Sequence, residues 1–225
     1  MKKLVFAMLI LISSGFLFAQ KQKPEFNRWS LDFNAGLNKT VRNFAPGYSS
    51  GLADFGEVNV GARYMFNAYA GLKLGLVFDR FRDGKDSPDF ATNMGRLSLD
   101  GVVNVGNALK FYQWTDRLGL LFHAGIGVGN FVDQGFPLFS STIDKVGSIT
   151  FGLTPQFKLN DKWSINLDAS VVGLARIHHS FDYSSNGTLK NGTSRGFNGQ
   201  FFTGTIGVSY YLGKKKSHAD WSPTK

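Results

Sequence analysis

The sequence predicts an all-β fold, an eight-stranded antiparallel transmembrane β-barrel, on three observations. Eight segments alternate between apolar and small or polar side chains, and side chains on a strand point to opposite faces in turn. The chain begins with an export signal, and no later apolar run approaches the roughly 20 residues of a membrane helix. The last alternating segment ends with a polar residue, a glycine and large apolar residues, in the order that is typical of the closing strand of outer-membrane barrels.

The first residues have the three zones of a secretory signal peptide. Lys2 and Lys3 precede an apolar run over 4–12, and Ala19 is a small residue at an expected cleavage point. An uncleaved anchor is the disfavoured alternative, because the run is too short to span a bilayer. We expect 1–19 to be a signal peptide, 20–213 to form the barrel, and 214–225 to be a basic periplasmic tail.

Composition limits the classes of function. With no cysteine, the chain has no disulfide, thiol catalyst or thiolate metal site. Glycine (27) and phenylalanine (22) are both frequent among the 225 residues, as expected of a small barrel. The net charge of +9 falls to +7 without Lys2 and Lys3. Because no basic stripe is interleaved with aromatics, we expect no nucleic-acid binding and interpret the excess as charge near anionic lipid.

The first four expected strands are 29–38, 55–66, 70–79 and 96–104. In each, every second residue is mainly apolar, and the residues between are largely Gly, Ser, Asn or charged. The faces expected to contact lipid comprise, strand by strand, Trp29, Leu31, Phe33, Ala35 and Leu37; Val58, Val60, Ala62, Tyr64 and Phe66; Ala70, Leu72, Leu74, Leu76 and Phe78; and Leu97, Leu99, Gly101 and Val103.

The other four expected strands are 118–129, 148–158, 163–171 and 197–212. A soluble sandwich also alternates, but its polar face would carry many Lys and Glu, whereas Gly, Ser, Thr and Asn suit a narrow lumen. The faces of these four strands that are expected to contact lipid comprise, strand by strand, Leu118, Leu120, Phe122, Ala124, Ile126 and Val128; Ile149, Phe151, Leu153, Pro155 and Phe157; Trp163, Ile165, Leu167, Ala169 and Val171; and Ile206, Val208, Tyr210 and Leu212.

The connections indicate the orientation. Tight turns at 66–69 and 159–162 alternate with long polar loops at 39–54, 82–92, 130–145 and 182–196. Short turns of such barrels face the periplasm, so we expect an outer-membrane location with both termini periplasmic. The segment 105–117 is long yet on the turn side. Its Leu109, Tyr112 and Trp114 suggest an amphipathic turn at the interface, with plain strand extension as the alternative.

The last strand carries a closing-strand signal. A polar Thr205 is followed two residues later by Gly207 and then by large apolar Tyr210 and Leu212. We expect this signal to engage the barrel-assembly machinery. Aromatic residues at the turn-side strand ends, among them Trp29, Trp114 and Trp163, predict an aromatic girdle.

The inward faces predict an ionic network inside the barrel. Eight strands leave an interior just wide enough for side chains to fill, so charges there must pair or meet trapped water. A closed plug is the favoured interpretation, and a gated ion path is the alternative; no cofactor or metal site is expected. The expected members are Asp32, Glu57, Arg63, Lys73, Asp79, Arg96, Asp100, His123, Asp168 and Arg176.

A candidate enzymatic site lies at the end of the seventh expected strand. His178 and Ser180, with Asp182 nearby, resemble elements of PagL-type lipid A deacylases and of PagP palmitoyltransferases. However, the Asn expected after the His-x-Ser element of the deacylases is missing, and His178 and Ser180 have inward parity. We therefore expect no catalytic residue, and a lipid A-modifying enzyme remains an alternative only.

Three stretches resemble the barrel domain of OmpA-like outer-membrane proteins: 117–125, 151–159, and 211–216 with 218–221. The resemblance implies a barrel anchored in the outer membrane with a structural or porin-like role. In two-domain members, a tail like 218–221 leads into a peptidoglycan-binding domain. We expect that domain to be absent here, in either a natural barrel-only protein or a fragment of a longer one.

The long loops are the expected recognition surface. Loops on a rigid scaffold commonly carry recognition. We expect these to pack over the barrel mouth or contact outer-membrane lipid and lipopolysaccharide; a binding subunit of a larger, secretion-type outer-membrane complex is the alternative. Their aromatic residues are Phe44, Tyr48, Phe90, Phe136, Phe139 and Tyr183.

Overall fold

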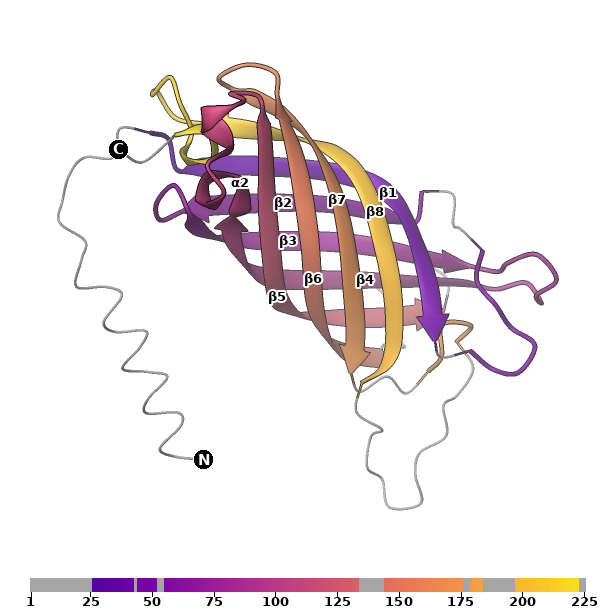
Figure 1. Ribbon diagram of the computed structural model, residues 1–225. Helices are drawn as coiled ribbons and strands as arrows, with labels where there is room; N and C mark the ends of the chain where they lie inside the picture. The colour runs from indigo at the N-terminus through magenta and orange to yellow at the C-terminus, as the bar shows by residue number, and fades with distance from the viewer. Residues whose placement is uncertain are drawn as a thin grey trace, which may run out of the picture.

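The computed structural model is a closed antiparallel barrel whose eight strands pair in chain order (Figure 1). It describes residues 26–42, 44–51, 55–133, 144–175, 179–183 and 197–222, so the expected signal peptide lies outside the described residues. The strands are β1 Trp29–Arg42, β2 Glu57–Met65, β3 Ala70–Arg82, β4 Ala91–Asn104, β5 Leu118–Asp133, β6 Asp144–Lys158, β7 Trp163–Ala175 and β8 Phe197–Leu212.

The last strand closes the barrel against the first. β8 pairs with β1 from Leu212 opposite Trp29 to Gln200 opposite Arg42. Thr205 and Gly207 point inward and Tyr210 and Leu212 outward, as the alternation predicts. No helix in the described part of the chain is long and apolar enough to cross a membrane.

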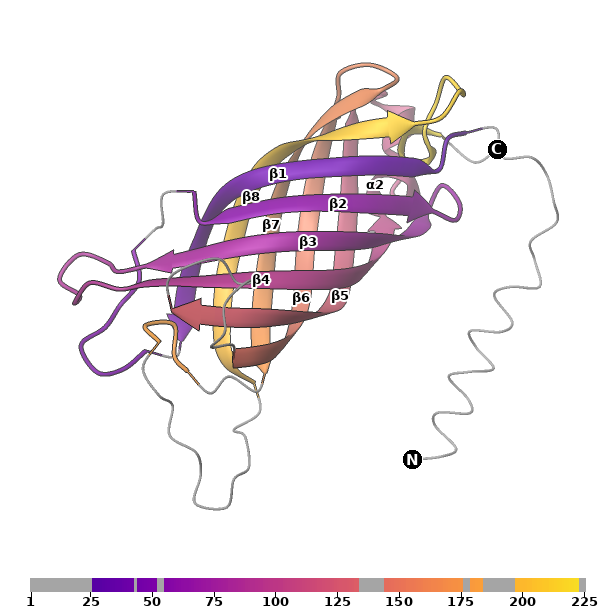
Figure 2. The same cartoon turned by 180° about the vertical axis from the view of Figure 1, so that it is seen from behind.

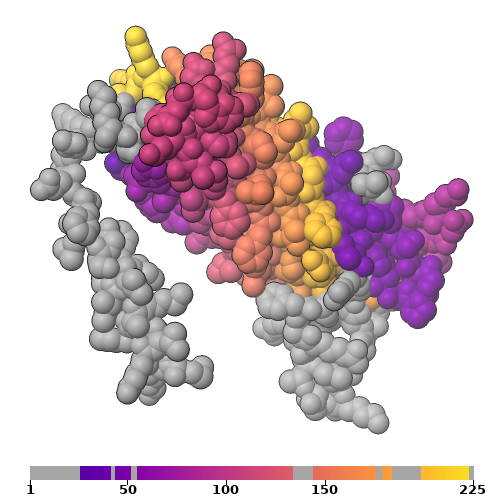
Figure 3. Space-filling view, in the orientation of Figure 1, coloured from indigo at the N-terminus to yellow at the C-terminus, as the bar shows by residue number. Residues whose placement is uncertain are grey.

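The two ends of the barrel differ. The end with short turns, which we call the turn end, also carries the β1 start and the C-terminal residues. Figures 1 and 2 show the β3–β4 connection and the described part of the β1–β2 connection, 44–51, at the opposite end, which we call the loop end. The connection between β4 and β5 forms α2 Val105–Ala108 and η1 Phe111–Gln113, so the turn is confirmed and strand extension was wrong. This segment stands out from the turn end in Figure 3.

The outer wall is apolar along its length. Leu74 is 51% exposed, and Leu99, Ile126 and Ile206 are exposed to a similar or greater extent. At the turn end, the Trp29 and Tyr64 rings are 4.9 Å apart and the Trp163 and Tyr210 rings 4.7 Å apart. Every strand exposes large apolar side chains on one face. This is the pattern expected of a barrel with an apolar exterior.

Several strands are longer at the loop end than the sequence predicted. β1 continues to Arg42, β5 to Asp133, and β6 begins at Asp144. The predicted boundaries of β5 and β6 were wrong because inward positions there, such as Phe131 and Val146, are apolar, and the alternation fades when both faces are apolar. In β1 the inward Thr40 stays polar, but Lys39 places a charge on the outward face and so hides the continuation. The inward residues form a loop-end cluster of Phe81, Met94, Phe131, Val146, Val172, Leu174, Phe181 and Phe201.

Candidate functional site: the lumen and the tail that closes it

Two groups of charges lie in the lumen between the loop-end cluster and the turn end. Arg96 Nε donates to Asp79 Oδ2 at 2.8 Å, and both side chains are buried. Glu57 lies directly opposite Asp79 across β2 and β3. The Arg96 guanidinium also lies 5.4 Å from the centre of the Phe201 ring, so it contacts the loop-end cluster.

A second group lies nearer the middle. His123 Nε2 is 2.9 Å from Asp168 Oδ2, which also accepts a hydrogen bond from Thr154 at 2.6 Å. Lys73 pairs with Asp100 in the strand register, and Ser98 donates to Asp100 at 2.9 Å. Since Ser170 and Asp168 approach the same nitrogen of His123, the three residues lack the relay geometry of a hydrolytic triad.

Inward glycines make room for these charged side chains. A Cβ on Gly125 would lie 2.2 Å from Asp100 Oδ1, and one on Gly129 would lie 2.9 Å from Arg96 Cγ. On Gly152, a Cβ would lie 2.3 Å from His123 Nε2. Glycine at these positions is therefore a packing requirement of the lumen.

Two small cavities lie among these groups. One cavity of about 20 Å³ is bounded by Asp32 and Arg63, among others, and a second of about 30 Å³ by Glu57 and Asp100, among others. Lys73, His123 and Asp168 line both cavities and so lie between them. Each cavity has room for one or two water molecules.

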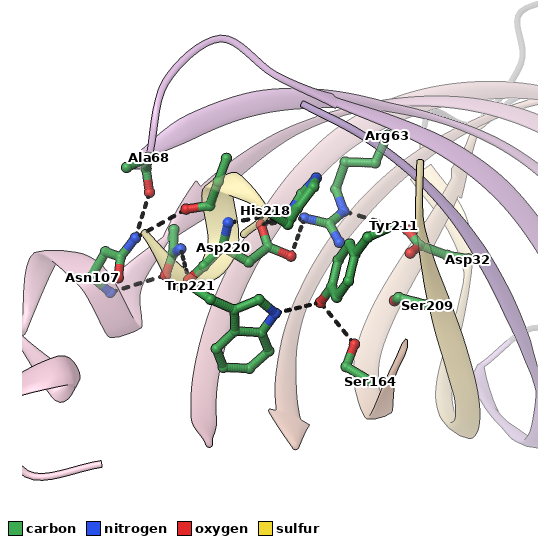
Figure 4. Close-up of polar contacts among 12 residues, drawn as sticks. Asp32, Arg63, Ala68, Asn107, Ser164, Ser209, Tyr211, His218, Asp220 and Trp221 are labelled. Carbon is green, nitrogen blue, oxygen red and sulfur yellow. Dashed lines mark hydrogen bonds and ion pairs between the residues drawn. The ribbon is translucent and has the colours of Figure 1, made fainter. Parts of the chain in front are cut away.

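The turn end of the lumen is closed by the chain's own C-terminal segment. Residues 217–222, which we call the tail cap, contain the short helix η2 Ala219–Trp221. Asp220 Oδ1 and Oδ2 lie 2.7 and 2.8 Å from Nη1 of Arg63. Arg63 also approaches Asp32 at 3.4 Å from Nε, so one buried guanidinium lies between two carboxylates (Figure 4).

Two asparagines hold the backbone of the tail cap. Asn104 Nδ2 donates to the Asp220 carbonyl at 3.0 Å. Asn107 Nδ2 donates to the Ala219 carbonyl at 3.3 Å and to the Ala68 carbonyl at 2.9 Å, which links the tail cap to the β2–β3 turn (Figure 4). Asn104 also caps α2 by accepting from the Asn107 amide at 2.9 Å, so the helix fixes both donors.

Aromatic side chains complete the closure. The Tyr211 ring stacks on His218 with centroids 4.3 Å apart, and its hydroxyl accepts from Trp221 Nε1 at 2.9 Å. Ser164 Oγ lies 2.8 Å from the same hydroxyl (Figure 4). A Cβ on Gly119 would meet the Trp221 ring at 3.0 Å, so the indole lies closely against β5.

The surroundings of Asp220 favour the ionised form of its carboxyl group. Burial raises the pKa of this carboxyl, but the positive charge of Arg63 and the contacts with His218 outweigh burial and hold the pKa below its usual range. Asp220 is therefore ionised at neutral pH, and the tail cap places a negative charge on the guanidinium.

The sequence did not reveal this closure. Asp220 and His218 lay in a segment expected to be a basic tail, although both are buried. Tyr211 was the available signal, because it is a large aromatic on the otherwise small or polar face of the last strand, and it is fully buried here. Of the predicted network residues, Arg176 lies outside the described part of the chain.

At the described end of the enzymatic alternative, Asp182 and the neighbouring His179 contact different segments. Asp182 Oδ1 accepts from the Ala45 amide at 3.2 Å, whereas the His179 amide donates to Asp144 at 3.1 Å. Ser180 is buried, and His178 lies outside the described residues. Among the residues that the structure describes, no group of three or more His, Asp or Glu is placed to hold a metal ion.

No protein-family model and no curated protein matches this sequence. Among solved structures, Neisserial surface protein A is 10% identical with a TM-score of 0.51, covering 82% of this chain and 97% of that chain. OprG from Pseudomonas aeruginosa is 10% identical (84% and 98% covered, TM-score 0.47). Ail from Yersinia pestis is 18% identical (83% and 99% covered, TM-score 0.43).

The chain therefore has the fold of the eight-stranded outer-membrane barrels. The predicted fold class is confirmed, and the structure is consistent with the OmpA-like barrel that the sequence resembles.

Proposed function

We propose that this protein is an outer-membrane barrel with a structural or anchoring role, with both termini on the periplasmic side and a lumen that is closed to ions. The observation that carries the proposal is the filled interior. The tail cap occupies the turn end, ion pairs occupy the middle, and the loop-end cluster occupies the other end. The two lumen cavities described above hold only one or two waters each.

The loop aromatics support the same role. Phe44 lies 5.9 Å from both Phe90 and Phe181, and Tyr48 lies 6.1 Å from Phe90, measured between ring centres. These rings pack against one another at the loop end, which favours closure over capture of a protein partner. Phe136 and Phe139 lie outside the described residues. Outer-membrane lipid and lipopolysaccharide are the partners we propose for the wall, and the barrel-assembly machinery for Thr205–Leu212.

Conductance in planar bilayers tests the proposal. The full chain should give few and brief openings, because an ion would have to cross buried, paired charges. Frequent steady openings that are altered by Arg96→Gln or Asp100→Asn would contradict the closed lumen and favour a porin-like role. The exposed Asp86→Asn is the matched control and should leave the record unchanged.

A lipid A assay tests the non-enzymatic part of the proposal. The composition of acyl chains should be the same in cells with and without the protein. A difference that disappears in Ser180→Ala would establish the enzymatic alternative instead. A discrete protein that co-purifies after gentle extraction, and is lost when 134–140 is shortened, would establish the complex-subunit alternative.

A further inference from the structure

We propose that the turn-end mouth of the barrel is a binding site for an acidic peptide segment, and that the tail cap is its detachable occupant. The mouth consists of Arg63, Asn104, Asn107, Ser164 and Tyr211. This inference goes beyond the structural role and does not depend on whether the lumen conducts.

The contacts are those by which proteins recognise extended peptides. Asn104 and Asn107 donate to successive backbone carbonyls of the tail cap, and Asn27 forms a parallel β-bridge with His218. The Asn27 amide donates to the Ser217 carbonyl at 2.8 Å, and the Ala219 amide donates to the Asn27 carbonyl at 3.0 Å. Main-chain hydrogen bonds of this kind provide affinity without demanding a particular sequence.

Two side-chain positions provide the selectivity. Arg63 is 1% exposed and binds the carboxylate of Asp220. An uncharged side chain in place of Asp220 would leave the guanidinium paired with Asp32 alone. The Trp221 indole lies beside Gly119 and donates to Tyr211. The site therefore fits a carboxylate followed directly by an aromatic residue.

The mouth has supports of its own that do not involve the tail cap. Asp32 contacts Arg63, Ser164 contacts the Tyr211 hydroxyl, and the Ala68 carbonyl accepts from Asn107. Because these partners belong to strands, to α2 or to the β2–β3 turn, the site keeps its shape when the tail leaves. A preorganised site loses less entropy on binding.

The connection to the tail cap permits detachment. Gly213 has a φ of +126°, which only glycine adopts without strain, and exposed Lys214, Lys215 and Lys216 follow it. The three adjacent positive charges repel one another and lie outside the mouth. The tail cap therefore joins the barrel through a bend at Gly213 rather than through a continuous strand, and Asn27 holds the Lys215 backbone by two hydrogen bonds, of 2.8 and 3.0 Å, that must open when the tail leaves.

A nicked protein tests the inference. We would replace Lys214–Lys216 of the full chain by a specific protease site, fold and purify the protein, and then cut it. A fluorescent peptide of residues 217–225 should exchange into the cut barrel. It should bind the uncut protein at least about tenfold more weakly, because the covalent tail competes for the site at high effective concentration.

Matched peptides establish the specificity. The D220N peptide should bind at least about tenfold more weakly, the size expected for a lost hydrogen bond to a charged group. A peptide of 214–225 should bind no more weakly than the shorter one, because the Lys215 backbone adds two hydrogen bonds to Asn27. The inference is overturned if the cut tail never exchanges, if the D220N peptide binds equally well, or if cut and uncut proteins bind the peptide equally. Asn107→Ala in the cut barrel provides a second test, since it should weaken binding while leaving Arg63 in place.

Discussion

Replacing Arg63 by methionine removes the one cation shared by Asp32 and Asp220. Arg63 Nη1 lies 2.7 Å from Asp220 Oδ1, Nε lies 3.4 Å from Asp32 Oδ2, and all three side chains are almost fully buried. Removing one partner of a buried ion pair typically costs about 3–5 kcal/mol. Because both carboxylates lose their counter-charge, we expect R63M to lower the free energy of unfolding by about that amount.

The assay is urea unfolding of the full chain in lipid vesicles, followed by the gel shift between folded and unfolded barrel. The exposed Arg117→Met is the matched control, and it should change the free energy of unfolding by less than about 0.5 kcal/mol. A triple variant that adds Asp32→Asn and Asp220→Asn removes the unpaired charges and should recover most of the loss. The reasoning is refuted if R63M is as stable as the control, or if the triple variant is no more stable than R63M.

Three further outcomes are expected. Leu74→Arg, near the middle of the outward face, should lower the free energy of unfolding in vesicles by about 2–4 kcal/mol. If Arg at position 74 were tolerated as well as Arg at the exposed position 86, this result would count against a lipid-facing wall. Gly119→Ala should press on the Trp221 ring and speed amide hydrogen exchange in 217–222; unchanged exchange would contradict the packing. The depressed pKa of Asp220 means that its contribution to docking is complete above the ordinary carboxyl pKa of about 4 and is lost as the pH falls from there through the depressed pKa. The protection of tail-cap amides, measured as exchange relative to the intrinsic rate at each pH, should therefore fall on acidification, and D220N should abolish that part of the fall.

The barrel was predictable because its main signal is local. A strand has a side-chain period of two, so Leu97, Ser98, Leu99 and Asp100 identify the outward and inward faces without any knowledge of tertiary structure. Closure by the last strand followed from the same alternation in 205–212. The predicted inward charges that fall in the described residues all lie on the inward faces of their strands.

The loop-end strand boundaries were not predictable in the same way. Phe81 and Phe131 point inward, beyond the predicted ends of their strands, where the pattern led us to expect small or polar residues, and so the alternation appeared to end early. Their burial depends on rings from four different segments meeting inside one barrel. Periodicity along a single strand carries no information on such an encounter.

The tail cap was missed for a related reason. Arg63 and Asp220 are 157 positions apart, and their pairing requires the barrel to be closed before the two can meet. The three lysines beside the bend at Gly213 gave 214–225 the composition of a solvated tail. Only the inward parity of Tyr211 indicated that something bulky lies inside the turn end.

Alternate labelling of β4 tests most directly whether this barrel spans the membrane with its lumen closed. The natural chain has no cysteine, so single cysteines at Leu97, Ser98, Leu99 and Asp100 can each be labelled alone in lipid bilayers. The cysteines at 97 and 99 should react with a lipid-soluble maleimide, whereas those at 98 and 100 should resist both the lipid-soluble and a water-soluble maleimide. Equal reaction of all four cysteines with a lipid-soluble maleimide would contradict the strand orientation, and rapid reaction of 98 and 100 with the water-soluble maleimide would contradict the closed lumen.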